Sequence, residues 1–193
     1  MRRAGIVVVT VLALTAVGAL AAPARAATPA TPGRIDALRG ATRAIVVFNW
    51  SARTTRAVVR TYQRARPGDR WRLVRGPMPA RIGYNGFSAN RHEGDGTTPA
   101  GIFGFVYGFG SQPNPGMHGF SYRRLRPDSW AVIDFNYRHP VYKKGSGIFL
   151  HQQTGGPTAG CVSLRPRDLV AVLRWIRPGT RIAMGPAAYL NRL

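Results

Sequence analysis

The 193-residue sequence predicts a mainly β fold, a sandwich or barrel of short strands with one helix and long loops. The first observation is a series of β-branched and aromatic runs separated by Arg, Pro, Gly and Asp, which is typical of such folds. The second is a content of 23 Gly and 15 Pro, which suits turns better than helices. The third is that only one segment repeats its apolar residues at a helical period.

Each expected strand is a short apolar run with turn residues on both sides. In chain order these runs are 44–48, 57–62, 71–74, 102–107, 131–135 and 147–151, with a last strand at 181–184. The helix is expected over 167–177, where four apolar residues fall on one face: Leu169, Val172, Leu173 and Ile176. A proline at its start and a Pro-Gly pair at its end mark its limits.

Three Gly- and Pro-rich segments between the expected strands are long enough to be functional loops: 83–101, 108–119 and 155–160. Loops on a rigid β scaffold commonly carry binding residues. Four tryptophans are expected at separate core positions and not as a binding platform: Trp50, Trp71, Trp130 and Trp175.

The N-terminal segment 1–26 has the layout of a secretory signal peptide. Arg2 and Arg3 precede an uncharged apolar run over 4–22, and small residues end in an A-x-A pattern at Ala26. Because the apolar run is long, an uncleaved membrane anchor is the alternative. The composition of residues 27–34 predicts a flexible spacer. Residues 35–193 are expected to form one folded domain, located outside the cell or in the cell wall.

The chain carries 28 Lys+Arg against 7 Asp+Glu, a formal charge of +21, and all of these cations except Lys143 and Lys144 are Arg. Cleavage after Ala26 removes three cations and no acid, so the mature charge is still +18. This charge argues against a neutral cytosolic enzyme and indicates an anionic cell-envelope polymer as a partner. Export and the lack of a binding motif argue against nucleic acid. We expect a monomer without stable membrane contact once the signal is cleaved.

The single cysteine, Cys161, excludes an intrachain disulfide and a multi-thiolate metal site. His151 ends one apolar strand and Cys161 begins the next apolar segment, so pairing of the two strands would bring imidazole and thiol together. A thiol is mostly protonated at neutral pH and needs a base, which histidine supplies. The alternative is a buried, inert cysteine and a structural histidine. The other histidines lack metal-binding spacing, and we expect neither metal nor cofactor.

Two motifs resemble the catalytic elements of the YkuD-type L,D-transpeptidase family of cell-wall enzymes. The turn TAGC at 158–161 is similar to the Ser/Thr-His-Gly-Cys turn that carries the family's nucleophile. Upstream, EGDGTTPAGIF at 93–103 resembles the family's DG-x-TP-x-G-x-F element. The resemblance covers roughly 35–186 and implies a β-sandwich of mixed sheets with one helix in the C-terminal region and long active-site loops.

The resemblance also implies roles for individual residues. Cys161 would be the nucleophile, His151 the general base and acid, and the Gln152 carbonyl the group that orients the imidazole. Backbone amides of Gly160 and Cys161 would receive the oxyanion, with Thr158 positioning the turn or a substrate carbonyl. Further expected substrate contacts are Ser163, Arg165 and His118.

The sequence departs from the family pattern at three points. Ala159 stands where the family often has His, Ser163 stands where many members have Arg or Asn, and only nine residues separate His151 from Cys161. The expected nucleophile and base remain, so these departures bear on substrate details more than on the reaction type.

The implied reaction is transfer of a peptidoglycan stem peptide through a Cys161 thioester, ending in cross-linking or, with water as acceptor, in L,D-carboxypeptidase trimming. The rival from another class is a non-catalytic basic protein that binds the cell wall. A papain-like peptidase is disfavoured because such enzymes place Cys before His along the chain, whereas here His151 precedes Cys161.

Overall fold

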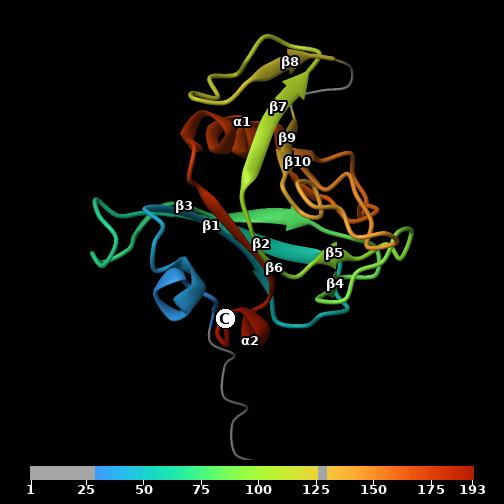
Figure 1. Cartoon of the computed structure of the whole chain (residues 1–193), viewed down its shortest axis with the longest axis horizontal. Coiled ribbons are helices and arrows are strands. Elements are labelled where there is room, and N and C mark those ends of the chain that lie inside the picture. Colours follow the sequence, from blue (N-terminus) through green and yellow to red (C-terminus); the bar gives the residue numbers. More distant parts are fainter. Residues whose placement is uncertain (1–28, 126–129) are drawn as a thin grey trace, which may run out of the picture.

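The computed structural model describes residues 29–125 and 130–193, so the predicted signal segment lies outside the described residues. Its elements, labelled in Figure 1, are short and follow in this order: η1 Pro32–Arg34, η2 Asp36–Leu38, β1 Arg43–Asn49, β2 Arg56–Gln63, β3 Arg72–Arg81, β4 Phe87–Ser88, β5 Thr98–Pro99, β6 Gly101–Phe103, β7 Phe105–Gly110, β8 Tyr122–Arg124, β9 Trp130–Ile133, β10 Phe149–Gln152, β11 Val162–Leu164, α1 Pro166–Trp175, β12 Arg181–Pro186 and α2 Ala187–Leu190. No helix in the described ranges is long and apolar enough to cross a membrane.

Ten of the strands form one mixed sheet in the order β6-β12-β1-β2-β3-β11-β10-β9-β7-β8. Three neighbouring pairs are parallel, namely β1 with β12, β10 with β11 and β7 with β8. The mainly β prediction is confirmed, and the expected sandwich takes the form of one curled ten-stranded sheet, with β4 and β5 as a separate parallel pair. The strand predicted over 102–107 is two strands, β6 and β7, which separate at Gly104.

Both faces of the sheet are covered around β1, because its side chains alternate between two cores. Ile45 and Val47 pack in the larger core, to which α1 contributes Leu169, Val172 and Leu173. Val46 and Phe48 point the other way, into a smaller core that η2 and α2 close. Figure 1 shows α1 on one side of β1, β2 and β3, with the 3-10 helices and α2 on the other.

Two sequence expectations need correction. Part of the segment 27–34 predicted as a flexible spacer is packed: Ala30 is buried in the smaller core and Pro32 is buried in η1. Apolar contact with β1 and α2 therefore starts before Ile35. Trp50 is not a core residue, since 55% of its surface is exposed.

Arg64 is buried directly after β2, where no carboxylate of the described residues pairs with it and backbone oxygens satisfy it instead. Its guanidinium donates to the carbonyls of Ala41 (2.7 Å), Leu38 (3.0 Å) and Arg39, and lies 4.2 Å from the centre of the Trp71 ring. The carbonyls at the end of η2 are thereby tied to the sheet. Part of the high arginine content thus serves the fold and not a partner.

We expect Arg64→Gln to lower the free energy of unfolding by about 2–3 kcal/mol, because several buried carbonyls lose a charged donor. Urea unfolding of the mature chain measures this loss. Arg66→Gln removes the same charge from an exposed position and is expected to change stability by less than about 0.5 kcal/mol. Equal losses in the two variants would contradict a structural role for Arg64.

Candidate active site

The parallel pairing of β10 with β11 brings the predicted nucleophile and base to the same sheet face. His151 lies opposite Ser163 and Leu150 opposite Val162, so the register continues to Cys161 beside Phe149. Residues paired across neighbouring strands point to the same face, and so do residues two apart along a strand. The imidazole of His151 and the thiol of Cys161 are therefore diagonal neighbours on adjacent strands.

The imidazole of His151 is held by a backbone carbonyl and a ring. Nδ1 lies 2.7 Å from the Gln152 carbonyl oxygen, which can only accept, so Nδ1 carries the proton and Nε2 keeps the lone pair. This is the contact expected for Gln152. The ring of Trp130 packs 4.9 Å from the imidazole, within a cluster that includes Phe149 and Phe109. Burial lowers the pKa of His151 below its ordinary value, and the Gln152 contact offsets only part of that effect.

The Cys161 thiol is partly buried and points toward the loop that precedes β10. Its Sγ is a 3.5 Å donor to the Gly147 carbonyl. Burial raises the pKa of the thiol above its ordinary value, although the Phe149 backbone N–H and the positive charge of Arg91 act in the opposite direction. The raised cysteine pKa and the lowered histidine pKa together favour a neutral thiol beside a neutral imidazole.

The turn before Cys161 is fixed by two threonine hydroxyls that converge on one carbonyl. Thr158 Oγ1 donates to the Cys161 carbonyl at 2.6 Å, and Thr98 Oγ1 donates to it at 3.4 Å. Thr158 Oγ1 also accepts from the Gly160 amide at 3.1 Å. Thr158 thus positions the turn, whereas the Gly160 amide, expected to receive an oxyanion, already has a partner.

Arg91, which the sequence analysis did not single out, lies against this turn with only 4% of its side chain exposed. Its Nη1 donates to the Thr97 carbonyl and pairs with Asp95 Oδ1 at 3.2 Å. A Cβ atom at Gly160, where φ is +139°, would meet Nη1 at 2.6 Å, so only glycine fits between Arg91 and Cys161. A fixed positive charge therefore lies directly behind the Cys161 turn.

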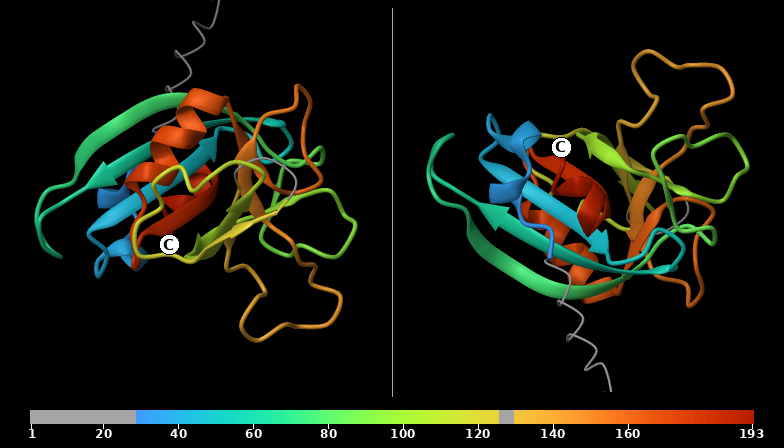
Figure 2. Two further views of the ribbon diagram at one scale, coloured as in Figure 1. Left: turned by 90° about the horizontal axis from the view of Figure 1, so that it is seen from above. Right: turned by 90° about the horizontal axis from the view of Figure 1, so that it is seen from below.

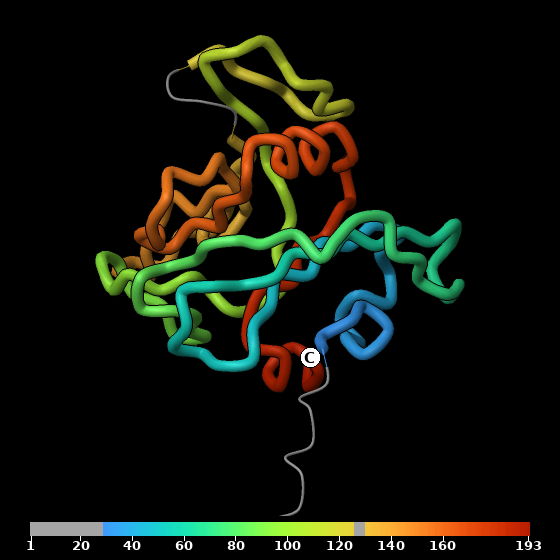
Figure 3. The backbone as a smooth tube through the Cα atoms, turned by 180° about the vertical axis from the view of Figure 1, so that it is seen from behind, coloured from blue at the N-terminus to red at the C-terminus, as the bar shows by residue number. Residues whose placement is uncertain are grey.

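Asp95 organises the DG-x-TP segment that holds Arg91. Its carboxylate accepts from the His92 amide (2.7 Å) and from both the amide and the hydroxyl of Thr97 (2.8 Å each). Burial raises the pKa of Asp95, but these hydrogen bonds and the Arg91 charge outweigh it, so the net pKa lies below its ordinary value. The carboxylate stays ionised and keeps Arg91 in place. Figure 3 shows this segment beside the loop that precedes Cys161, and the Thr98 hydroxyl, which donates to the Cys161 carbonyl at 3.4 Å, joins the two.

The remaining predicted site residues lie at different distances from this centre. Ser163 is 1% exposed and is the register partner of His151, and its hydroxyl has no hydrogen-bond partner within the described residues. Arg165 is exposed and lines a separate cavity of about 420 Å³. His118 is exposed in a loop that packs on the end of α1, where Arg174 Nε donates to the Pro115 carbonyl. The structure thus joins Ser163 to the centre and leaves His118 beside the helix.

A long loop over residues 136–147 forms the other side of the thiol and projects from the body of the molecule (Figure 2). Asn136 holds its base, since the side-chain amide donates to the carbonyls of Val141 (3.1 Å) and Gly145 (2.7 Å). Its far end reaches Gly147, whose carbonyl receives the Cys161 thiol. The loop is therefore an ordered wall of the site.

Comparison with known proteins shows the family of the chain. The family model of the L,D-transpeptidase catalytic domain, YkuD, matches residues 43–184. Among solved structures, L,D-transpeptidase 1 of Mycobacterium tuberculosis is similar at 16% identity over 74% of this chain and 62% of that chain, with a TM-score of 0.37. An L,D-transpeptidase from Mycobacterium smegmatis is similar at 15% identity over 75% and 59%, with a TM-score of 0.40. The chain spans about three-fifths of the length of these structures. No curated protein sequence matches it.

Thr158→Val is expected to lower the free energy of unfolding by about 1–2 kcal/mol, because the Cys161 carbonyl loses its shortest donor. Thr158→Ser keeps the hydroxyl and serves as the matched control. Urea unfolding of both variants tests the assignment. If the serine variant is as unstable as the valine variant, the hydrogen bond is not the cause.

Arg91→Gln is expected to raise the pKa of Cys161 further, because a positive charge that favours the thiolate is lost. Arg91→Lys keeps the charge, so its pKa should stay closer to that of the wild type. Titration of thiolate absorbance near 240 nm measures the midpoint, since Cys161 is the only cysteine. A purely structural Arg91 would lower stability in both variants and leave the two midpoints equal.

Proposed function

Because the chain belongs to the L,D-transpeptidase catalytic-domain family, we propose that it is a cysteine acyltransferase acting on the stem peptides of peptidoglycan. The observation that supports this most strongly is the placement of His151 and Cys161 on one face of paired strands, with Nδ1 of the histidine bound to a carbonyl. That arrangement leaves Nε2 as the base for the thiol.

In the first half-reaction, Sγ of Cys161 attacks the carbonyl carbon of the amide bond before a terminal D-amino acid. The S–C bond forms as the thiol proton passes to Nε2 of His151. Collapse of the tetrahedral intermediate breaks the C–N bond, and the imidazolium returns the proton to the departing amine. A thioester between Cys161 and the stem peptide remains.

The second half-reaction uses the same two residues in reverse. An amine of a second stem peptide attacks the thioester carbonyl, His151 accepts its proton, and Cys161 leaves as the thiol. The product is a cross-link between two stems. Water in place of the amine gives a trimmed stem, so the acceptor decides between transpeptidation and carboxypeptidase activity.

The neutral resting pair sets the direction of the pH dependence. A lowered histidine pKa keeps Nε2 unprotonated and able to accept a proton at neutral pH, whereas a raised cysteine pKa keeps the thiol protonated until attack. Acylation therefore depends on proton transfer during attack and not on a preformed thiolate. Activity falls as pH drops through the pKa of His151, because the base becomes protonated.

In the tetrahedral intermediate, the negatively charged oxygen lies beside the backbone amide of Cys161. Since the Gly160 amide donates to Thr158 Oγ1, the amide of Cys161 itself is the principal oxyanion donor in this proposal. The two threonine hydroxyls on the Cys161 carbonyl hold that peptide unit in orientation. Ser163 supports His151 from the neighbouring strand, and Arg165 receives anionic groups of the substrate.

We place the enzyme outside the cell, as a monomer in the cell wall. The N-terminal signal pattern supports export, and the charge of +21 for the full chain supports attraction to an anionic envelope. This attraction raises the local concentration of enzyme at the wall and is separate from the chemistry at Cys161.

Intact-mass measurement of the mature chain with a disaccharide tetrapeptide tests the proposal. Wild type is expected to release a terminal D-amino acid and to show a transient adduct on Cys161, while Cys161→Ala shows neither. His151→Gln is expected to form the adduct at least about 100-fold more slowly, because the general base is lost. Absence of both release and adduct in the wild type would instead favour a non-catalytic wall-binding protein.

A further inference from the structure

A groove lined by three arginines lies on the same sheet face as His151. Its first part is the cavity of about 420 Å³, with Arg56, Arg81, Arg165 and Gln153 around Val58, Pro77 and Pro79. Its second part, of about 240 Å³, is lined by Phe48, Trp50 and neighbouring residues. The two parts share Arg56, Ala57 and Val58, so they form one continuous groove.

The strand register explains how the groove relates to the active site. Arg56 on β2 lies opposite Arg81 on β3, Arg81 lies opposite Ser163, and Ser163 lies opposite His151. These four residues form one row across four strands and point to one face. Arg81 is two strand spacings from His151, or about 10 Å.

The guanidinium groups of this groove have no acidic partner among the described residues. Like charges placed directly opposite on neighbouring strands are destabilising, so stability does not account for Arg56 beside Arg81. None of the residues that line the groove is acidic, and within the described ranges none of its three guanidinium groups forms an ion pair.

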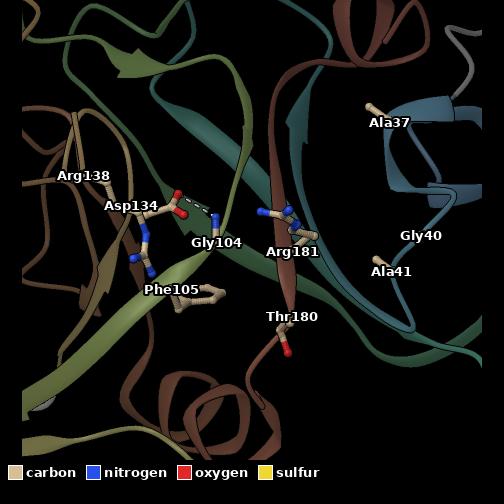
Figure 4. Close-up of a pocket in the computed structure, with 10 residues that line it drawn as sticks. Ala37, Gly40, Ala41, Gly104, Phe105, Asp134, Arg138, Thr180 and Arg181 are labelled. Carbon is tan, nitrogen blue, oxygen red and sulfur yellow. Dashed lines mark hydrogen bonds between the residues drawn. The ribbon is translucent and has the colours of Figure 1, made fainter. Parts of the chain in front are cut away.

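Another cavity of the protein differs in this respect. The cavity of about 590 Å³ that contains Arg138 and Arg181 also contains Asp134, whose carboxylate accepts from the Gly104 amide (Figure 4). Its lining thus includes a carboxylate of the chain together with two arginines, although neither arginine forms an ion pair with it within the described residues. The lining of the groove, in contrast, contains no carboxylate.

The lining also indicates what carries that anion. Guanidinium groups bind carboxylates and phosphates in bidentate fashion. Between and beside them lie the side chains of Val58, Pro77 and Pro79, and the exposed ring of Trp50 closes one end. Apolar lining gains free energy only from a ligand with apolar groups between its charges. A peptide with small aliphatic side chains and free carboxylates meets both conditions, whereas a polyphosphate chain meets only the first.

We propose that this groove binds the carboxylates of a peptidoglycan stem peptide, with Arg56, Arg81 and Arg165 as the anion-binding residues. The identity of the peptide rests on the proposed function. Four extended residues span about 13 Å, which exceeds the distance from Arg81 to His151, so a stem held in the groove can present its end at Cys161. The groove thus selects acidic stems before the reaction at the cysteine.

Calorimetric titration of the mature Cys161→Ala chain with a free tetrapeptide stem tests the groove without turnover. We expect Arg81→Gln to raise Kd about tenfold and Arg81→Lys to recover part of that loss. Arg75→Gln removes the same charge from an exposed position of β3 outside the groove and should change Kd less than about twofold. Amidation of the peptide carboxylates should weaken wild-type binding and abolish the difference between wild type and Arg81→Gln.

Two results would overturn the inference. One is equal Kd values for Arg81→Gln and Arg75→Gln, which would reduce the effect to overall charge. The other is tighter, Arg81-dependent binding of poly(glycerol phosphate), which would assign the groove to a phosphate polymer. The proposed function and the proposed groove can fail independently. If Cys161 forms an adduct but peptide binding does not depend on Arg81, the proposed function holds and the groove assignment fails. If binding depends on Arg81 but wild type forms no adduct, the groove assignment holds and the proposed function fails.

Discussion

The site depends on a parallel pairing of β10 and β11 that a connection of only nine residues, 153–161, makes possible. Parallel neighbours usually need a long crossover, because the chain must return to the same end of the sheet. Here the return segment is fastened to the end of β3 through Thr158, whose amide donates to the Ile82 carbonyl and whose carbonyl accepts from the Tyr84 amide. This fastening sets the register in which His151 and Cys161 share a face.

Burial and charge act against each other at the thiol, and the balance determines how it can react. Burial disfavours the thiolate, while Arg91, held in turn by Asp95, favours it. We propose that the result is a protected neutral thiol, which the imidazole of His151 activates. The arginines of the chain thus have separate uses: Arg64 ties the N-terminal segment to the sheet, Arg91 lies behind the nucleophile, and the groove arginines remain available to a ligand.

Much of the fold and the proximity of the two proposed catalytic residues were predictable, because they depend on local patterns. The apolar runs predicted β1, β2 and β12, and the helical period predicted both ends of α1 to within two residues. Arg91 was not predictable, since it acts on Cys161 from 70 positions away and no local pattern marks a buried arginine among 28 cations. Thr98 lies in the DG-x-TP motif, but its bond to the Cys161 carbonyl depends on how distant segments meet. Trp130 was expected in the core, yet it packs on the imidazole. Arg56 and Arg81 meet only through strand register, which the sequence alone leaves open.

The central claim is that the imidazole of His151 activates the thiol of Cys161 across the β10–β11 pair. The most direct measurement is the rate of alkylation of the single cysteine by iodoacetamide at neutral pH, in the wild type and in His151→Gln. A thiol that depends on this base should react at least about tenfold more slowly in the variant, with unfolding unchanged. Equal rates in two equally stable proteins would contradict the claim, because the thiol would then react without the histidine.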